Sequence, residues 1–181
     1  GQLVVVTGIP SHGKSSFTDW KVLNLIKDYN FKASWFSPEH TPLHQYQANL
    51  CEKVVGKNYT KQVGNVPRIT KEEILEYKEW ANEKIYLTDC GSDQLPTWDW
   101  LLDKFKEQMY SFGINIFVID AFNKVLLPKG NKIEQINIVL TKLTHFAQAN
   151  NVLIYLVAHP TKMKKSEEGI RLAVIEEELT E

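Results

Sequence analysis

The segment from Gly8 to Ser15 constrains this chain more than any other feature of its sequence. It reads Gly-Ile-Pro-Ser-His-Gly-Lys-Ser and fits the pattern G-x-x-x-x-G-K-[ST]. A short β-branched run at residues 3–6 precedes it, and a segment with apolar residues near helical spacing follows it at residues 14–29. A glycine-rich turn between a strand and a helix predicts a P-loop, in which backbone N–H groups and the positive end of the helix surround phosphate.

Strand-like and helix-like segments alternate along the rest of the chain. Thr70, with Glu73 three positions later, is typical of a capping box at the start of a helix. Alternation of this kind predicts parallel strand pairing and a layered α/β fold. The predicted strands are residues 3–6, 33–37, 84–87, 114–119 and 152–158, and the predicted helices are residues 14–29, 42–55, 70–82, 98–112 and 132–150.

The end of the chain differs from the rest in charge. Residues 167–181 carry six acidic side chains and one basic side chain, Arg171, so residues 1–166 have a net charge of +4. That mild excess permits a nucleic-acid partner without indicating one. Residues 169–175 fit one more strand, and the segment from residue 166 fits a short amphipathic helix equally well. We predict a core domain at residues 1–165 and an acidic tail at residues 166–181.

Composition excludes several classes of protein. The 181 residues are 43% apolar and 24% charged, as expected of one globular domain that buries a core. No apolar run reaches the length of a membrane span, and no charged-then-apolar leader precedes the first strand. Cys51 and Cys90 are too few for a disulfide scaffold and lack metal-ligand spacing. We therefore expect a cytoplasmic protein with no membrane partner.

Each residue type in a P-loop has a chemical role. Lys14 supplies a positive charge for the β- and γ-phosphates, and the Ser15 hydroxyl is a ligand for Mg²⁺. We therefore predict ATP and Mg²⁺ as cofactors. The predicted nucleotide-binding residues are Gly8, Ser11, His12, Gly13, Lys14, Ser15 and Ser16.

Three polar residues follow predicted strands at the strand ends where open α/β sheets bind ligands. Asp120 is the expected second Mg²⁺ ligand, although an aspartate in this position is also common as a turn residue. Because Ala121 follows Asp120, the acid that activates water is expected elsewhere, and Glu39 is the candidate. The alternative for Glu39 is a surface turn, which Pro38 favours. His159 fits a sensor of the γ-phosphate, or else a capping residue at the edge of the core.

Four motifs, in this order, resemble the RecA-like motor domain of hexameric replicative helicases, the DnaB and Twinkle group that includes phage primase-helicases. Two of them, the P-loop and the strand ending in aspartate, are shared by all P-loop ATPases. The segments that contain Glu39 and His159 are more specific to this group of helicases. The resemblance covers about residues 1–165. The matching segments are residues 1–15, Ser37-Pro38-Glu39, Val118-Ile119-Asp120 and Val157-Ala158-His159-Pro160-Thr161-Lys162.

The resemblance implies a RecA-like P-loop NTPase core, with a mostly parallel sheet and helices on both faces. It implies that the strand before Glu39 neighbours the P-loop strand and that Glu39 is the catalytic base. It implies that His159 stands where the bacterial enzymes have glutamine, as in the Twinkle branch. The function implied is that of an ATP-hydrolysing motor core of a phage-type replicative DNA helicase. Lys14, Glu39, Asp120 and His159 would be its catalytic residues.

In this family the loops after Asp120 and after His159 face the channel of a hexameric ring. Lysines in such loops contact phosphates, so binding of single-stranded DNA should be salt-sensitive and independent of sequence. Solvated loop lysines are the equally weighted alternative. The candidate DNA-contacting residues are Lys124, Lys129 and Lys132 in the first loop and Lys162, Lys164 and Lys165 in the second.

The chain also departs from the family pattern. The arginine beyond residue 68 is Arg171, which stands in the acidic tail without a matching motif around it, so no arginine finger is identified. We therefore expect a core fragment or a pared-down relative that binds ATP and turns it over slowly or undetectably when alone. The alternatives are a RecA-superfamily ATP-binding regulator or recombinase-like switch without unwinding activity, and a degenerate structural subunit. The intact Lys14 and Ser15 argue against the last.

Overall fold

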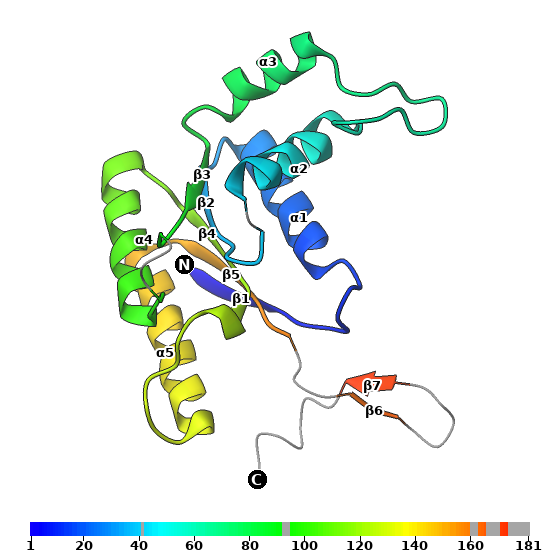
Figure 1. Cartoon of the computed structure of the whole chain (residues 1–181). Coiled ribbons are helices and arrows are strands. Elements are labelled where there is room, and N and C mark those ends of the chain that lie inside the picture. The colour runs from blue at the N-terminus through cyan, green and yellow to red at the C-terminus, as the bar shows by residue number, and fades with distance from the viewer. Residues whose placement is uncertain (41, 92–94, 160–162, 166–170, 174–181) are drawn as a thin grey trace.

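The computed structural model of the chain describes residues 1–40, 42–91, 95–159, 163–165 and 171–173. Its helices follow the predicted segments to within one residue at each end (Figure 1). The helices are α1 (Lys14–Tyr29), α2 (Leu43–Val55), α3 (Lys71–Ala81), α4 (Trp98–Phe112) and α5 (Lys132–Asn150), with a short 3₁₀ turn η1 (Phe122–Lys124). The strands are β1 (Gln2–Val6), β2 (Ala33–Phe36), β3 (Ile85–Thr88), β4 (Ile116–Asp120), β5 (Leu153–Val157), β6 (Met163–Lys165) and β7 (Arg171–Ala173).

The central sheet has five strands in the order β1-β5-β4-β2-β3, and every pair in it is parallel. The prediction that the strand before Glu39 neighbours the P-loop strand is wrong. Strands β4 and β5 pair with each other between β1 and β2, so β2 lies third from the P-loop strand. The predicted parallel α/β sheet itself is confirmed.

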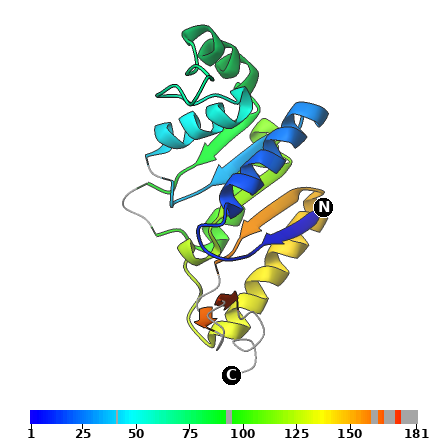
Figure 2. The same cartoon turned by 90° about the vertical axis from the view of Figure 1, so that its right-hand side faces the viewer.

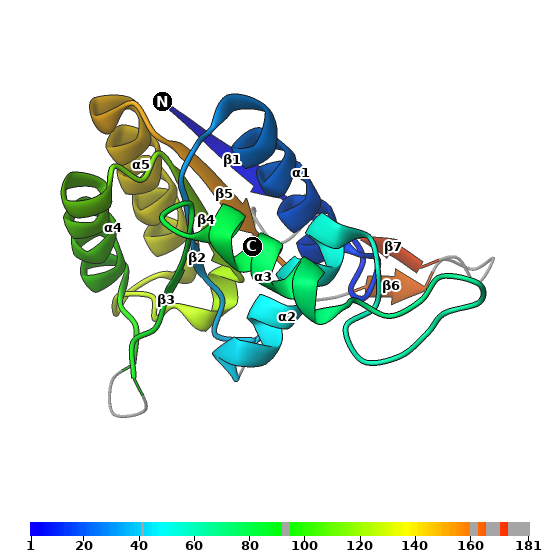
Figure 3. The same ribbon diagram turned by 90° about the horizontal axis from the view of Figure 1, so that it is seen from above.

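Helices cover both faces of the sheet, as predicted (Figure 3). Side chains that alternate along β4 reach opposite faces, as they do on any strand. Phe117 and Ile119 pack in the cluster that includes residues of α4 and α5, whereas Ile116 and Val118 pack in the cluster that includes residues of α1 and α2. Because β4 is buried on both faces, its sequence is a continuous apolar run rather than an alternating one.

Helix α3 lies outside α2 at one end of the molecule (Figure 2). Its start is the predicted capping box: the Glu73 N–H donates to Thr70 Oγ1 over 3.2 Å, and the Thr70 N–H donates to Glu73 Oε2 over 2.9 Å. None of the residues of α3 is buried. The capping box, contacts to α2 and the packing of the partly buried Trp80 against one core cluster therefore stabilise this helix.

The second sheet is an antiparallel pair, β6 and β7, in which Lys165 is paired with Arg171. Of the two structures left open for the tail, the strand is the one present, at residues 171–173. The pair spans the predicted boundary at residue 165, which stays a prediction. Within the part of the chain that the structure describes, no helix is both long and apolar enough to cross a membrane.

Candidate nucleotide site

The P-loop joins β1 to α1 through a backbone conformation that glycine adopts more easily than other residues. Gly13, the residue before α1, has φ 78°, where a side chain would be strained. No side chain caps the first turn of α1, which leaves its N–H groups directed toward the loop. This is the arrangement that anions occupy at helix N-termini.

Lys14 lies inside this loop. Its residue is only 8% exposed, and Nζ donates to the carbonyl oxygens of Gly8, over 2.7 Å, and Ile9, over 3.0 Å. Of the other predicted binding residues, Ser15 and Ser16 lie in the first turn of α1, and the rest belong to the loop before it. There the exposed His12 Nδ1 atom lies 2.9 Å from the Pro10 carbonyl oxygen. The positive charge of Lys14 is therefore held at the concave side of the loop by carbonyl groups that a phosphate can replace.

Asp120 is the last residue of β4 and is 1% exposed. Its Oδ1 atom is buried and has no hydrogen-bond partner among the described residues, and its Oδ2 atom lies 3.9 Å from His40 Nδ1. Burial raises the pKa of this carboxyl group, whereas the nearby Ser15 hydroxyl and the His40 ring oppose that rise in pKa. A buried oxygen without a partner is costly, so this one suits a cation ligand.

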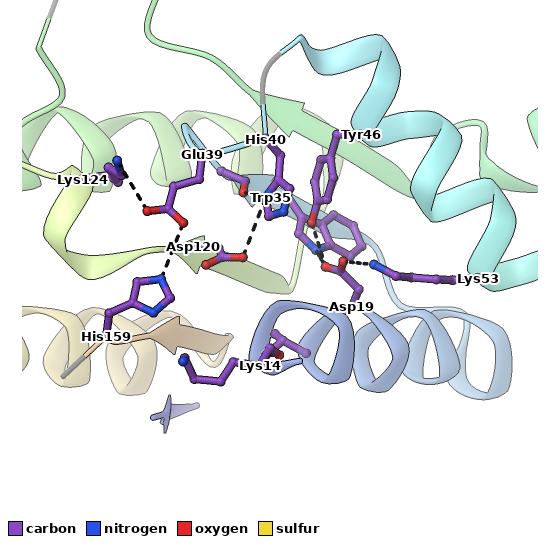
Figure 4. A network of polar contacts seen from close by, with 12 residues as sticks. Lys14, Asp19, Trp35, Glu39, His40, Tyr46, Lys53, Asp120, Lys124 and His159 are labelled. Carbon is purple, nitrogen blue, oxygen red and sulfur yellow. Dashed lines mark hydrogen bonds and ion pairs between the residues drawn. The ribbon is translucent and has the colours of Figure 1, made fainter. Parts of the chain in front are cut away.

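Glu39 and His159 meet beside Asp120 (Figure 4). Glu39 Oε2 lies 3.5 Å from His159 Nε2, and Glu39 Oε1 lies 3.5 Å from Lys124 Nζ. One ligand atom from each of Glu39, Asp120 and His159 falls within 4.8 Å of the other two. Three residues that lie far apart in the sequence therefore form one cluster, as the strand-end positions predicted.

The sheet register explains how these residues come together. Phe36 of β2 pairs with Ile119 of β4, and Asp120 pairs with Val157 of β5, so the three strands end at one edge. Glu39 and His159 follow the ends of their strands by three and two residues. Although β2 does not touch β1, it borders the strand that ends in Asp120, and this border brings Glu39 into the site.

Several residues of the site were not predicted from the sequence. Asp19, Trp35, Tyr46 and Lys53 form a buried polar cluster behind the P-loop helix, and His40 connects this cluster to Asp120 (Figure 4). One signal was available: Asp19 lies four residues after Ser15, among the apolar residues that α1 buries. A carboxylate on a buried helix face requires partners, but their identity depends on the tertiary fold.

The candidate DNA-contacting lysines lie on several elements. Lys124 ends η1 and pairs with Glu39, Lys129 lies between η1 and α5, and Lys132 is the first residue of α5. Lys164 and Lys165 belong to strand β6 rather than to a loop, because residues 163–165 pair with residues 171–173. Lys162 lies outside the described residues.

No protein-family model matches the chain. A comparison with curated proteins finds the Twinkle homolog protein, chloroplastic/mitochondrial, of Arabidopsis thaliana, 32% identical in an alignment of 174 residues that covers 93% of this chain. The chain is thus similar to a Twinkle protein over nearly all of its own length. It spans 24% of the length of that Arabidopsis relative.

Two solved structures share the fold of this chain. One of them, an isolated ATPase domain, matches 90% of this chain and 57% of its own, with a TM-score of 0.63 and 16% identity. A DnaB-like replicative helicase, whose structure also describes its interactions with primase, matches 89% of this chain and 39% of its own, with a TM-score of 0.66 and 17% identity. The predicted RecA-like fold of the DnaB and Twinkle group is thus confirmed.

Proposed function

We propose that this chain is the ATP-binding and ATP-hydrolysing motor core of a replicative DNA helicase. The observation that carries the proposal is the cluster of Glu39, Asp120 and His159 at the end of the sheet that also bears the P-loop. Hydrolysis of a phosphoanhydride needs a phosphate cradle, a metal and a group that orients water. The described residues supply a candidate for each. The switch without unwinding activity is less favoured, since Glu39, the proposed water-orienting carboxylate, lies beside Asp120 and His159.

The donor set near Ser15 fits Mg²⁺. This ion takes oxygen ligands, often one or two from the protein and the others from phosphates and water. The Ser15 hydroxyl and Asp120 Oδ1, which has no hydrogen-bond partner within the described part of the chain, are oxygens of this kind, so these two residues would hold the ion. When bound, Mg²⁺ neutralises part of the charge on the phosphates.

The other side chains of the site have separate roles in binding phosphate and activating water. Lys14 and the N–H groups at the start of α1 bind phosphate oxygens. Glu39 accepts a proton from the attacking water or orients it, which is general-base chemistry. His159, 3.5 Å from Glu39, binds the γ-phosphate and senses whether it is present. Because Glu39 also pairs with Lys124, the water-orienting group is directly connected to the candidate DNA loop.

Binding of DNA is proposed for the assembled ring and not for this chain by itself. Single-stranded DNA is the proposed partner, contacted through lysines without sequence preference, within a hexameric ring. A neighbouring subunit or a segment outside this chain would supply the arginine finger. The phage-type assignment and the cytoplasmic location remain predictions from the sequence.

Nucleotide binding by the purified chain tests the proposal. Lys14→Ala should weaken binding of a fluorescent ATP analogue with Mg²⁺ by about 100-fold or more, because a phosphate loses a charge-assisted contact. Lys21→Ala is the matched control, since Lys21 lies exposed on the same helix. Sedimentation velocity with the analogue, with and without single-stranded DNA, then tests assembly. If the unmodified chain binds no nucleotide, the proposed function is wrong. If it binds nucleotide and ignores DNA, the motor function fails for this chain by itself, and an ATP-binding RecA-like domain remains.

A further inference from the structure

A buried carboxylate in α1 has no role in the chemistry described so far. Asp19 is 1% exposed and accepts three hydrogen bonds from two other elements. The donors are Trp35 Nε1, 3.0 Å from Oδ1, Tyr46 OH, 2.7 Å from Oδ1, and Lys53 Nζ, 2.5 Å from Oδ2. A buried charge persists only when it is paired and hydrogen-bonded. Asp19 therefore fixes β2 and α2 against the helix that begins at the P-loop.

Tyr46 carries this restraint toward the site. Its hydroxyl donates to Asp19, and its ring stacks on the His40 ring with centroids 4.6 Å apart and planes 16° apart. Burial and the nearby Asp19 charge raise the pKa of Tyr46, so the hydroxyl stays a donor at neutral pH. One end of Tyr46 is thus held by α1, while its face sets the plane of His40.

His40 completes the connection. Its Nδ1 atom lies 2.6 Å from Ser37 Oγ and 3.9 Å from Asp120 Oδ2. The imidazole is therefore restrained by the Ser37 hydroxyl and by the Tyr46 ring, and the Nδ1 atom that bonds Ser37 lies within ion-pair distance of the carboxylate when the ring is protonated. The opposite oxygen of Asp120, Oδ1, is the one for which the described residues provide no hydrogen-bond partner. The orientation in which Asp120 presents that oxygen thus depends on what holds Oδ2.

We propose that His40 is a positioning residue for Asp120, and that the Asp19–Tyr46 hydrogen bond fixes the place of His40. The chain of contacts from Asp19 through Tyr46 and His40 to Asp120 ties the P-loop helix to the carboxylate that holds Mg²⁺. This inference rests on the proposed function, since it takes Asp120 as a metal ligand. Groups that orient metal ligands typically change metal affinity by about 10- to 100-fold when removed.

The test separates the metal contribution from nucleotide binding as such. The affinity for a fluorescent ATP analogue is measured in EDTA and in Mg²⁺, and the ratio of the two dissociation constants reports how much Mg²⁺ tightens binding. His40→Ala should lower this ratio by about 10-fold or more while leaving the affinity in EDTA unchanged. A merely structural role would weaken binding equally in both buffers.

Three further variants provide a control, a partial rescue and a second test of the proposal. His44→Ala removes an exposed histidine of α2 and should keep the ratio of the unmodified chain. His40→Asn places an amide nitrogen near the position of Nδ1 and should restore part of the ratio. Tyr46→Phe keeps the ring stack but breaks the bond to Asp19, and should lower the ratio by less than His40→Ala does. If His40→Ala does not fold, Tyr46→Phe still tests the proposal.

The outcomes distinguish this inference from the proposed function. If the unmodified chain binds the analogue and Mg²⁺ tightens binding, the proposed site is present. The inference is then overturned by a ratio in His40→Ala within about twofold of that in His44→Ala, and the same result in Tyr46→Phe removes the Asp19–Tyr46 step. If the unmodified chain binds no nucleotide at all, the proposed function fails and the inference fails with it.

Discussion

Replacing Asp19 by alanine is the sharpest test of the buried polar cluster. The substitution leaves the Trp35 N–H and the Tyr46 O–H without an acceptor, and each of these residues is 1% exposed. Each buried donor left unsatisfied costs about 1–3 kcal/mol, which gives about 4 kcal/mol for the pair. The Lys53 side chain is 26% exposed, so water can solvate its ammonium group and it adds little.

Thermal unfolding followed by circular dichroism measures this loss. For a chain of this size, 1 kcal/mol shifts Tm by about 2–4 °C, so Asp19→Ala should melt about 8–16 °C below the unmodified protein. Asp28→Ala is the matched control, because Asp28 is exposed on the same helix, and it should cost no more than about 0.5 kcal/mol.

A milder substitution checks the reasoning about donors. Asp19→Asn keeps the oxygen that accepts from Trp35 and Tyr46, but it turns an amide N–H₂ group toward Lys53. It should therefore cost about 1–2 kcal/mol, less than alanine does. If Asp19→Ala melts within about 2 °C of Asp28→Ala, the cluster contributes no net stability and the argument from buried donors is refuted.

Three other perturbations have expected results. Measured in the assembled ring, Glu39→Gln should keep nucleotide affinity and slow single-turnover ATP hydrolysis by about 100-fold or more, and an unchanged rate would remove Glu39 as the base. Lys124→Ala should reduce the slope of log affinity for single-stranded DNA against log salt concentration by about 0.7, whereas an unchanged slope would place Lys124 off the DNA. Hydrogen bonds from Lys57 and Thr70 lower the pKa of Glu73 below its usual value, so its stabilisation is present at neutral pH and lost as the pH falls through the folded-state pKa. Urea unfolding at neutral pH and at a pH below that folded-state pKa should therefore show Glu73→Gln less stable than the unmodified chain only at neutral pH.

Local patterns predicted the elements of this fold well. The capping box at Thr70 and the apolar runs of the strands are decided by neighbouring residues, and helix ends at glycine, such as Gly56 and Gly113, need only a left-handed residue. Strand order, in contrast, is not decided by neighbouring residues. All five strands are apolar, and nothing in their sequences states which of them pair, so the position assigned to β2 was wrong.

The Asp19 cluster was not predicted from the sequence, for a related reason. Its donors lie 16, 27 and 34 residues further along the chain, on β2 and α2. A tryptophan in a strand, and a tyrosine and a lysine in a helix, have many possible partners, and only the packed fold selects one. A buried acid can thus be suspected from its place on an apolar helix face, whereas its partners cannot be named.

The error in strand order did not misplace Glu39, and the geometry of parallel sheets explains why. Every parallel strand ends at the same edge, so a polar residue after any strand reaches that edge regardless of order. Order then decides which polar residues meet. Because β2 borders β4, Glu39 meets the carboxylate of Asp120, and because β5 borders β4 on the other side, His159 completes the cluster. Strand ends alone thus predict that Glu39, Asp120 and His159 lie at one edge of the sheet, whereas their mutual contacts, and the proximity of His40 to Asp120, depend on the strand order.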